Sequence, residues 1–309
     1  SSDLSVNIQR TSNDTYFRVH DIDTTLVESE NTNLQNEITY NFSKNDTHLK
    51  ISGKVYEDLR KKTNARYEYI LPNILFGKTF FSERFGSIDF TSNALHRNYQ
   101  VNKEKTNFVN NIVWNPGSVI TKKGYINSFE GIFRNTNYKA KNAVDYKNDK
   151  VVNEFNGVLS YKSSLPMQKK GVNFSKIFIP NLMVKYSPGH MRDLSADEYL
   201  LNYSNLYSIN KTSEIEDGLS AILGFDYKIN KKGENNSDIE KISISLGQVF
   251  NLEENNDMPN SSSLGQKSSD VVGEIKYNFS EIGNIDYKFS IDHNINDINY
   301  SEVSTSLNF

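Results

Sequence analysis

The sequence predicts an all-β fold, specifically an antiparallel transmembrane β-barrel with about 14 to 16 strands in this chain, which would form part of a larger barrel. The first observation is compositional: only 36% of the 309 residues are hydrophobic, yet the chain contains 18 Tyr and 18 Phe. The second is a long-range alternation of apolar and polar residues, and the third is the series of turn-rich segments that separate the alternating runs. A barrel strand has one face in lipid and one in water, so a polar average with many aromatic residues is expected.

Two runs near the N-terminus alternate with period two, as strands with one apolar and one polar face do. In the first, the apolar set is Leu34, Ile38, Tyr40 and Phe42, against Gln35, Glu37, Thr39 and Asn41. In the second, the apolar set is Leu49, Ile51 and Val55, against Lys50, Ser52 and Lys54. The segment Ser43–Thr47 (SKNDT) between them is expected to be a short turn. The pattern is least clear at 11–32 and 135–150.

Four runs in the C-terminal part, around 218–230, 241–250, 271–279 and 285–292, alternate in the same way. An unpaired charge in the hydrocarbon zone costs about 2 to 4 kcal/mol at the midplane, so the polar side of each run is expected to face the lumen. The residues expected to face lipid are Leu219, Leu223, Phe225, Tyr277, Phe279, Tyr287 and Phe289. Those expected to face the lumen are Lys228, Lys276, Asp286 and Lys288.

The runs are about 10 to 12 residues long, whereas globular strands cluster near 5 or 6. With a rise of about 3.3 Å per residue and a tilt near 40°, about 10 residues cross the ~25 Å apolar band of an outer membrane. Rings expected at strand ends suit an interfacial girdle: Tyr40, Tyr161, Tyr186, Tyr227, Phe250 and Tyr300. The alternative is a soluble β protein with aromatic hairpin rims. Long loops are expected at Lys231–Asp238 and Asn251–Asp270, and a short connection at Ser280–Asn284.

Several classes of protein are excluded by what the sequence lacks. No stretch reaches the roughly 20 apolar residues of a spanning helix, and the run Ile177–Val184 is interrupted at Pro180. The absence of cysteine excludes disulfides, thiol catalysis and Cys-ligated metals. A net charge of −3 with no basic block argues against nucleic acid as a partner.

No catalytic, cofactor or metal site is predicted. The five histidines, at 20, 48, 96, 190 and 293, have no metal-binding spacing. Asp292 and His293 are adjacent, but neighbours in a strand point to opposite faces and are not expected to hydrogen-bond each other. The acidic residues Glu253, Glu254 and Asp257 lack the regular spacing of a calcium loop and are expected to lie in a solvated loop. After the turn at Pro188 and Gly189, Arg192 and Asp193 read as charged flanks, with a surface ion pair or a contact from Arg192 to a lipid phosphate as alternatives.

Several segments, taken in order, resemble the barrel region of the lipopolysaccharide-assembly outer-membrane protein family, also called the organic solvent tolerance family. The resemblance covers nearly the whole chain. Its N-terminal pieces are Thr11–Val19 (TSNDTYFRV), Asn33–Phe42, His48–Asp58 (HLKISGKVYED) and Tyr69–Phe76 (YILPNILF). Its later pieces are Pro180–Ser195 (PNLMVKYSPGHMRDLS), Asn202–Ser213 with Glu216–Tyr227, and Ile244–Phe250 (ISLGQVF), which is similar to an "I-S-x-G-Q" strand.

This resemblance implies a barrel in the cell outer membrane that passes lipopolysaccharide to the outer leaflet and is not an enzyme. In the family, a periplasmic jelly-roll docks on a lipopolysaccharide bridge, and the barrel encloses a plug lipoprotein and opens laterally. The partners it implies are therefore lipopolysaccharide, the plug lipoprotein, the bridge and outer-membrane lipid, with no cofactor. The alternative in a different class is a general or substrate-specific porin, although no constriction ring of charges is evident; a barrel protease or lipase is disfavoured because no catalytic constellation occurs.

Residues 1–309 are expected to be a fragment of such a barrel, without the jelly-roll and the closing strands, so Ser1 and Phe309 are not expected to be native ends. Against this, Val303, Thr305, Leu307 and Phe309 alternate as they do in a terminal barrel strand. The cysteines that many members use to link jelly-roll and barrel are absent.

Overall fold

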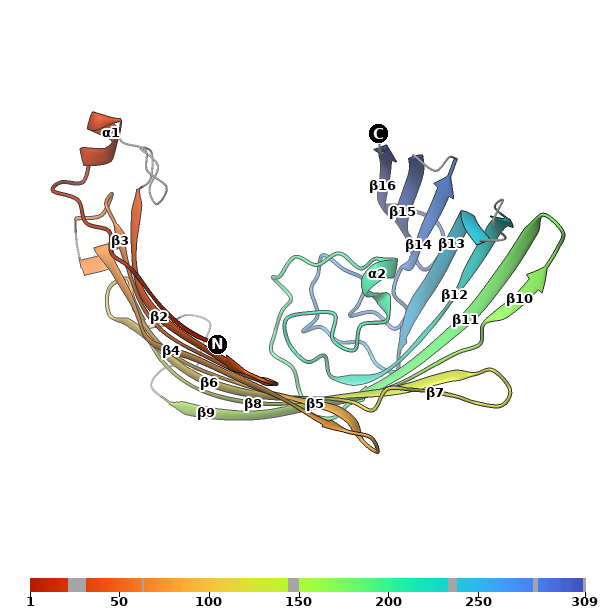
Figure 1. Ribbon diagram of the computed structural model, residues 1–309, viewed down its shortest axis with the longest axis horizontal. Coiled ribbons are helices and arrows are strands. Elements are labelled where there is room, and N and C mark those ends of the chain that lie inside the picture. Colours follow the sequence, from red (N-terminus) through yellow and green to blue (C-terminus); the bar gives the residue numbers. More distant parts are fainter. Residues whose placement is uncertain (22–31, 63, 144–149, 233–237, 280–282, 308–309) are drawn as a thin grey trace. The chain divides into compact units, whose positions relative to one another are not determined.

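A computed structural model of the chain describes residues 1–21, 32–62, 64–143, 150–232, 238–279 and 283–307 (Figure 1). Over these ranges there are 16 strands, and every pairing for which a register is determined is antiparallel, which confirms the all-β expectation. The helices are short: α1 (Tyr16–His20), α2 (Tyr203–Leu206) and a 3₁₀ turn at Asn64–Arg66. Within the described residues, no helix is long and apolar enough to cross a membrane.

Strands that follow one another in the sequence are neighbours in the sheet. The hydrogen-bonded order is β1-β2-β3-β4-β5-β6-β8-β9-β11-β12-β13-β14-β15-β16, while the short strands β7 and β10 pair with β8 and β11. This is the order that hairpin connections produce, because each strand folds back on the one before it. The expected pairing in sequence order is therefore confirmed.

The described chain divides into two compact units. Unit 1 contains residues 1–114 and 133–155, and unit 2 contains residues 115–132 and 156–309. The first six strands, all or nearly all in unit 1, are β1 (Ser2–Asn7), β2 (Asn33–Lys44), β3 (Thr47–Asp58), β4 (Tyr67–Ser82), β5 (Gly86–Tyr99) and β6 (Lys103–Asn115). Two further strands are divided between the units, β8 (Ile126–Lys141) and β9 (Val151–Ser164), and β6 contributes its last residue, Asn115, to unit 2.

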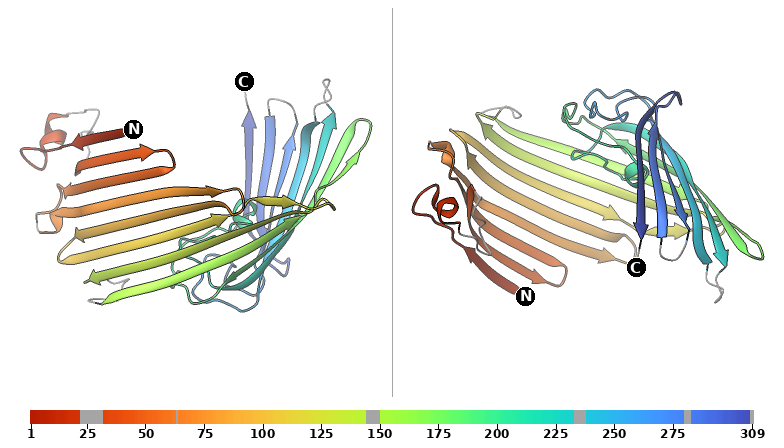
Figure 2. Two further views of the ribbon diagram at one scale, coloured as in Figure 1. Left: turned by 60° about the horizontal axis from the view of Figure 1, so that its bottom comes forward. Right: turned by 90° about the horizontal axis from the view of Figure 1, so that it is seen from above.

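Unit 2 holds the remaining strands, seen from two directions in Figure 2. They are β7 (Ser118–Ile120), β10 (Met167–Lys170), β11 (Phe174–Ser187), β12 (Gly218–Lys232), β13 (Asp238–Asn251), β14 (Val271–Asn278), β15 (Gly283–Ile291) and β16 (Ile298–Leu307). The expected connections at 231–238 and 280–284 fall largely on 233–237 and 280–282, and Phe309 of the expected terminal alternation lies beyond 307; these positions are outside the described residues.

Many strands are longer than the alternation predicted. Strands β4 and β8 each have 16 residues, and β12 has 15. The sequence reveals only the part of a strand that alternates clearly, while the backbone ladder continues beyond it. As a result Tyr40 and Tyr227 lie well inside β2 and β12, and their expected place at strand ends was wrong, whereas Tyr186 and Phe250 do lie next to the last residue of their strands.

Proline interrupts the sheet where β9 gives way to β10. Residues 159–164 of β9 pair with 181–186 of β11, and β10 pairs with 175–178 of the same strand. Pro180 in β11 has no N–H to donate, although its carbonyl accepts a hydrogen bond from the Leu165 N–H at 3.2 Å. The pairing therefore changes from β9 to β10 at this point.

The hydrophobic core of unit 2 lies between the sheet and two connecting segments. Residues 188–217, which include α2, join β11 to β12, and residues 252–270 join β13 to β14. We call them the cover segments; Figure 1 shows them against one face of β11–β14, which we call the covered face. The opposite face is the open face. The long connection expected after Asn251 is confirmed, but the first cover segment was not predicted to pack on the sheet.

Candidate functional site

The two faces of the sheet in unit 2 differ in chemistry. On β12 the open face reads Leu219, Ala221, Leu223, Phe225, Tyr227 and Ile229, without a charge. Leu223 on this face is 49% exposed, and Tyr277 of β14 is 47% exposed. Alternation places Lys228 on the covered face, and the register gives the same face to Lys276, Asp286 and Lys288. The expected division into an apolar and a charged face is present, with the apolar face being the one that the cover segments leave free.

The part of the covered face that the cover segments do not reach carries polar and charged side chains, and we call it the polar wall. Lys228 forms an ion pair with Glu240 at 2.8 Å, and both side chains are about one third exposed. Glu274 and Lys288 lie opposite each other on β14 and β15, as do Lys276 and Asp286. Because opposite charges alternate along these strands and remain partly exposed, this wall can be hydrated. One carboxylate oxygen, Asp286 Oδ1, is buried and accepts no hydrogen bond within the described residues.

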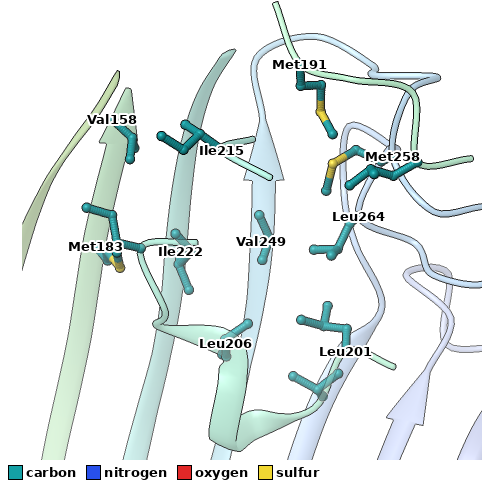
Figure 3. Close-up of a cluster of buried hydrophobic side chains, with 13 residues drawn as sticks. Val158, Met183, Met191, Leu201, Leu206, Ile215, Ile222, Val249, Met258 and Leu264 are labelled. Carbon is teal, nitrogen blue, oxygen red and sulfur yellow. The ribbon is translucent and has the colours of Figure 1, made fainter. Parts of the chain in front are cut away.

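The cover segments bury an apolar cluster against the other part of the covered face. Met183, Ile222, Val249 and Val272 come from four neighbouring strands and break the polar pattern of that face. Figure 3 shows Met183, Ile222 and Val249 facing side chains of the cover segments, with Met191 of the first segment pointing toward Met258 of the second. The cover-segment members of the cluster are Met191, Leu194, Leu201, Leu206, Ile209, Ile215, Met258 and Leu264.

A pair of glycines forms the seat for α2. Gly224 of β12 lies opposite Gly247 of β13, and Gly247 is the glycine of the ISLGQ motif. A Cβ at Gly247 would come within 2.4 Å of Leu206 Cδ2, and one at Gly224 within 2.4 Å of the Tyr207 hydroxyl. Any larger residue would displace the end of α2, so the close approach explains why both positions are glycine.

One strand carboxylate anchors the helix through hydrogen bonds. Asp226 accepts hydrogen bonds from the Tyr203 hydroxyl at 2.8 Å, the Ser245 hydroxyl at 2.7 Å and the Asn181 amide at 2.8 Å. Burial raises the pKa of Tyr203, and so does its contact with Asp226. The phenol therefore stays a neutral hydrogen-bond donor over the physiological range.

A buried cluster of three charges fixes the end of the first cover segment. Glu216 is hydrogen-bonded and ion-paired to Lys185 of β11, and its other oxygen accepts from the backbone N–H groups of Lys211 and Thr212 at 2.5 and 2.9 Å. The Lys211 ammonium lies 3.9 Å from Glu216, and all three charged side chains are at most 5% exposed.

The protonation states follow from this geometry. Burial alone would raise the pKa of Glu216, but the charges of Lys185 and Lys211 outweigh it and hold that pKa below its ordinary value. Burial lowers the pKa of Lys211 to about 8, against the attraction of Glu216. The carboxylate is thus charged at neutral pH, and the cluster is an internal ionic link between strand and cover segment.

A cavity of about 510 Å³ lies beside this cluster, between the two cover segments and the ends of β11–β13. Glu253, Glu254 and Asp257 line it together with Asp217, whose pKa is raised by burial and by the charge of Asp257. Nevertheless, in the described part of the chain no group of three or more His, Asp or Glu side chains is placed to hold a metal ion.

One expectation about a charged pair needs correction. Asp292 and His293 do contact each other, with 3.0 Å between Oδ1 and Nδ1, because β15 ends at Ile291 and the pair lies in a turn rather than in a strand. Arg192 contacts Glu214 at 3.1 Å, while Asp193 accepts a hydrogen bond from the Ser195 N–H. The charged flanks after Gly189 thus join two parts of the same cover segment.

The sequence patterns did not predict that the two cover segments pack against the covered face. A signal was available in the apolar residues that break the polar pattern of the covered face, such as Ile222 and Val249, and in the apolar content of 188–217. The burial of Glu216 had no such signal, since its partner Lys185 is distant in sequence.

Comparison with known proteins gives one match and one absence. A family model described as LptD, LPS transport system D, matches residues 2–309. No curated protein matches the chain. The match spans nearly the whole chain and agrees with the resemblance of its motifs and with its all-β fold. The chain therefore belongs to the LptD family and is the barrel region of a lipopolysaccharide transport protein.

Proposed function

We propose that this chain acts in the outer membrane, where its open face meets lipid hydrocarbon and its covered face borders the hydrated route of lipopolysaccharide to the outer leaflet. The observation that carries the proposal is the division of β12 into two faces. Leu219 and Ile229 are ten residues apart on the uncharged open face. At about 3.3 Å per residue and a tilt near 40°, that run spans about 25 Å, which is the height of the apolar band of an outer-membrane barrel.

The polar wall suits an amphipathic cargo. Phosphates and sugars need hydrogen bonds and counter-charges along their route, and residues such as Lys276, Lys288 and Glu274 offer both signs on one face. We propose transport without an enzymatic step, because the matching family is described as a lipopolysaccharide transport system.

The partners belong to the same proposal. A plug lipoprotein would pack against the polar covered face, and a periplasmic lipopolysaccharide bridge would deliver cargo through a jelly-roll domain, as the family resemblance implies. No observation on this chain favours a general porin, since the family match points to transport of lipopolysaccharide.

Photocrosslinking in the full-length protein tests the route. A photoreactive residue replaces Lys288 on the covered face or its neighbour Tyr287 on the open face. We expect the Lys288 position to crosslink lipopolysaccharide only while new lipopolysaccharide is being supplied, and the Tyr287 position to crosslink membrane lipid regardless of supply. The proposal would be contradicted if crosslinking depended equally on the supply of lipopolysaccharide at both positions, or if crosslinking at the Lys288 position did not depend on it.

A further inference from the structure

Three hairpins of unit 2 repeat one short motif at their turns. Lys-Lys-Gly occurs at 122–124 between β7 and β8, at 169–171, where its two lysines end β10, and at 231–233, where its two lysines end β12. All six lysines are exposed, and none forms an ion pair with a carboxylate in the part of the chain that the structure describes. We call these six lysines the lysine rim.

The second and third lysine pairs lie at the same end of their strands. The Lys232 N–H donates to the Asn173 carbonyl at 3.0 Å, so the end of β12 lies beside the turn between β10 and β11. The first motif lies near the beginning of β10, since a Cβ on Gly124 would be 3.7 Å from Cδ1 of Leu165, which stands two residues before that strand. Figure 1 shows the turn between β10 and β11 and the end of β12 on the side of unit 2 away from the cover segments.

The rim sits where the apolar band ends. On the open face of β12 the uncharged run stops at Ile229, and the next residue on that face is Lys231. On β11 the corresponding run from Tyr186 stops at Phe178, which is followed on the same face by Lys176. Lipid phosphates lie just outside the hydrocarbon, so ammonium groups at this height meet the phosphate layer.

Apolar side chains accompany the lysines at the turns. Ile120 is 71% exposed next to the first lysine pair, and Val172 is 88% exposed next to the second. Basic residues interleaved with exposed apolar ones are typical of segments that lie in a membrane interface.

The other end of unit 2 has the opposite charge. The first cover segment contains six Asp or Glu and the second contains four, against Arg192, Lys211 and Lys267. An anionic surface would be repelled at this end and attracted at the lysine rim, which gives the unit one preferred orientation.

We propose that the lysine rim binds the phosphate groups of anionic glycerophospholipids and thereby fixes the depth of unit 2 in the membrane. Barrels have short turns at the periplasmic side and long loops outside. The connection between β10 and β11 is short, whereas the cover segments at the other end of these strands are long, so the rim lies at the leaflet made of glycerophospholipid. The inference rests on the proposed outer-membrane location and adds a lipid class and a binding surface to it.

Native mass spectrometry of the full-length protein in detergent tests this. The probes are phosphatidylglycerol, phosphatidylcholine with the same acyl chains, and lipid A. The test variant replaces Lys169, Lys170, Lys231 and Lys232 with Gln, and the matched control replaces four exposed lysines of unit 1, Lys62, Lys139, Lys141 and Lys150, with Gln.

We expect the wild type and the control to prefer phosphatidylglycerol over phosphatidylcholine, and the test variant to lose about tenfold or more of that preference. The preference should also disappear for the wild type in about 1 M salt, where the screening length is about 3 Å. If heat-modifiable migration shows that the variant does not fold, the salt dependence of lipid binding by the wild type still tests the proposal.

Three results would overturn the proposal: an unchanged preference in the test variant, a preference that survives the salt, or tighter rim-dependent binding of lipid A. Supply-dependent crosslinking at the Lys288 position, measured in parallel, separates a failure of this inference from a failure of the proposed function.

Discussion

The two units use the same alternating strands but differ in how they bury apolar surface. Unit 2 holds a cluster of 13 buried hydrophobic residues, most of them from cover segments. In the described part of unit 1, only five hydrophobic residues are buried: Leu34, Leu59, Tyr138, Ala140 and Ala143. A single sheet with both faces free cannot build a core of its own, so the core of unit 2 is a product of its connections.

The polar face of unit 1 is stabilised in another way. Glu37 pairs with Lys54 at 3.1 Å across β2 and β3, and Arg66 pairs with both Glu57 and Asp14 at 2.6 Å. These pairs keep contact with water, whereas Lys185 and Glu216 of unit 2 are almost wholly buried. The difference predicts that equivalent changes will have unequal effects in the two units.

The largest effect is expected for Glu216→Gln. The change leaves Lys185 and Lys211 as buried positive charges without a counter-charge, which typically costs about 3 to 5 kcal/mol. In the folded full-length protein, the first cover segment should become sensitive to limited proteolysis and lose protection from hydrogen exchange. Glu37→Gln is the matched change in unit 1 and should cost about 0 to 1 kcal/mol; comparable losses would contradict the distinction between the units.

The ionic link of Glu216 with Lys185 and Lys211 should weaken as the pH falls. The pKa of Glu216 is lower in the folded protein than its ordinary value of 4.5, so its contribution is present above pH 4.5 and is lost as the pH falls through the folded value. Protection of the first cover segment should therefore decrease on acidification in the wild type. Glu216→Gln should remove that part of the acid sensitivity, and an unchanged acid profile would show that another group is responsible.

Placing a charge on the apolar strand face should have a similar effect in both units. Phe225→Arg places a charge in the apolar band of unit 2, and Phe76→Arg does so on the apolar face of unit 1, where Phe76 lies opposite Leu49. Each should cost about 2 to 4 kcal/mol near the midplane and lower the amount of heat-modifiable protein in the outer membrane. Lys228→Ser, on the covered face, should be nearly silent; normal assembly of either Arg variant would mean that its face does not meet lipid.

A smaller effect is expected for Gly247→Ala. The added methyl would lie 2.4 Å from Leu206 Cδ2 and 3.0 Å from the Leu223 carbonyl, so α2 must move, at a cost of about 1 to 3 kcal/mol. Protease cleavage within 188–217 is the measurement. Gly77→Ala in unit 1 is the control because its nearest neighbours are 4.0 Å away; equal cleavage in both variants would argue against the glycine seat.

The sequence by itself determined the strands and their faces. Residues such as Leu223 and Phe225 face one way and Asp226 and Lys228 lie where alternation puts them, because successive strand residues must point to opposite sides. The order of the strands also followed from the sequence, since short hairpin turns leave each strand beside the one before it.

Only the tertiary structure decided what covers one of these faces. Alternation is a local property, whereas Leu206 reaches Gly247, and Glu216 reaches Lys185, through contacts that no local pattern encodes. The same holds for Asp226, which reads as an ordinary lumen residue and in fact anchors α2 through Tyr203. A connecting segment packs where its apolar side chains find a complementary surface, and that surface exists only once four strands have paired.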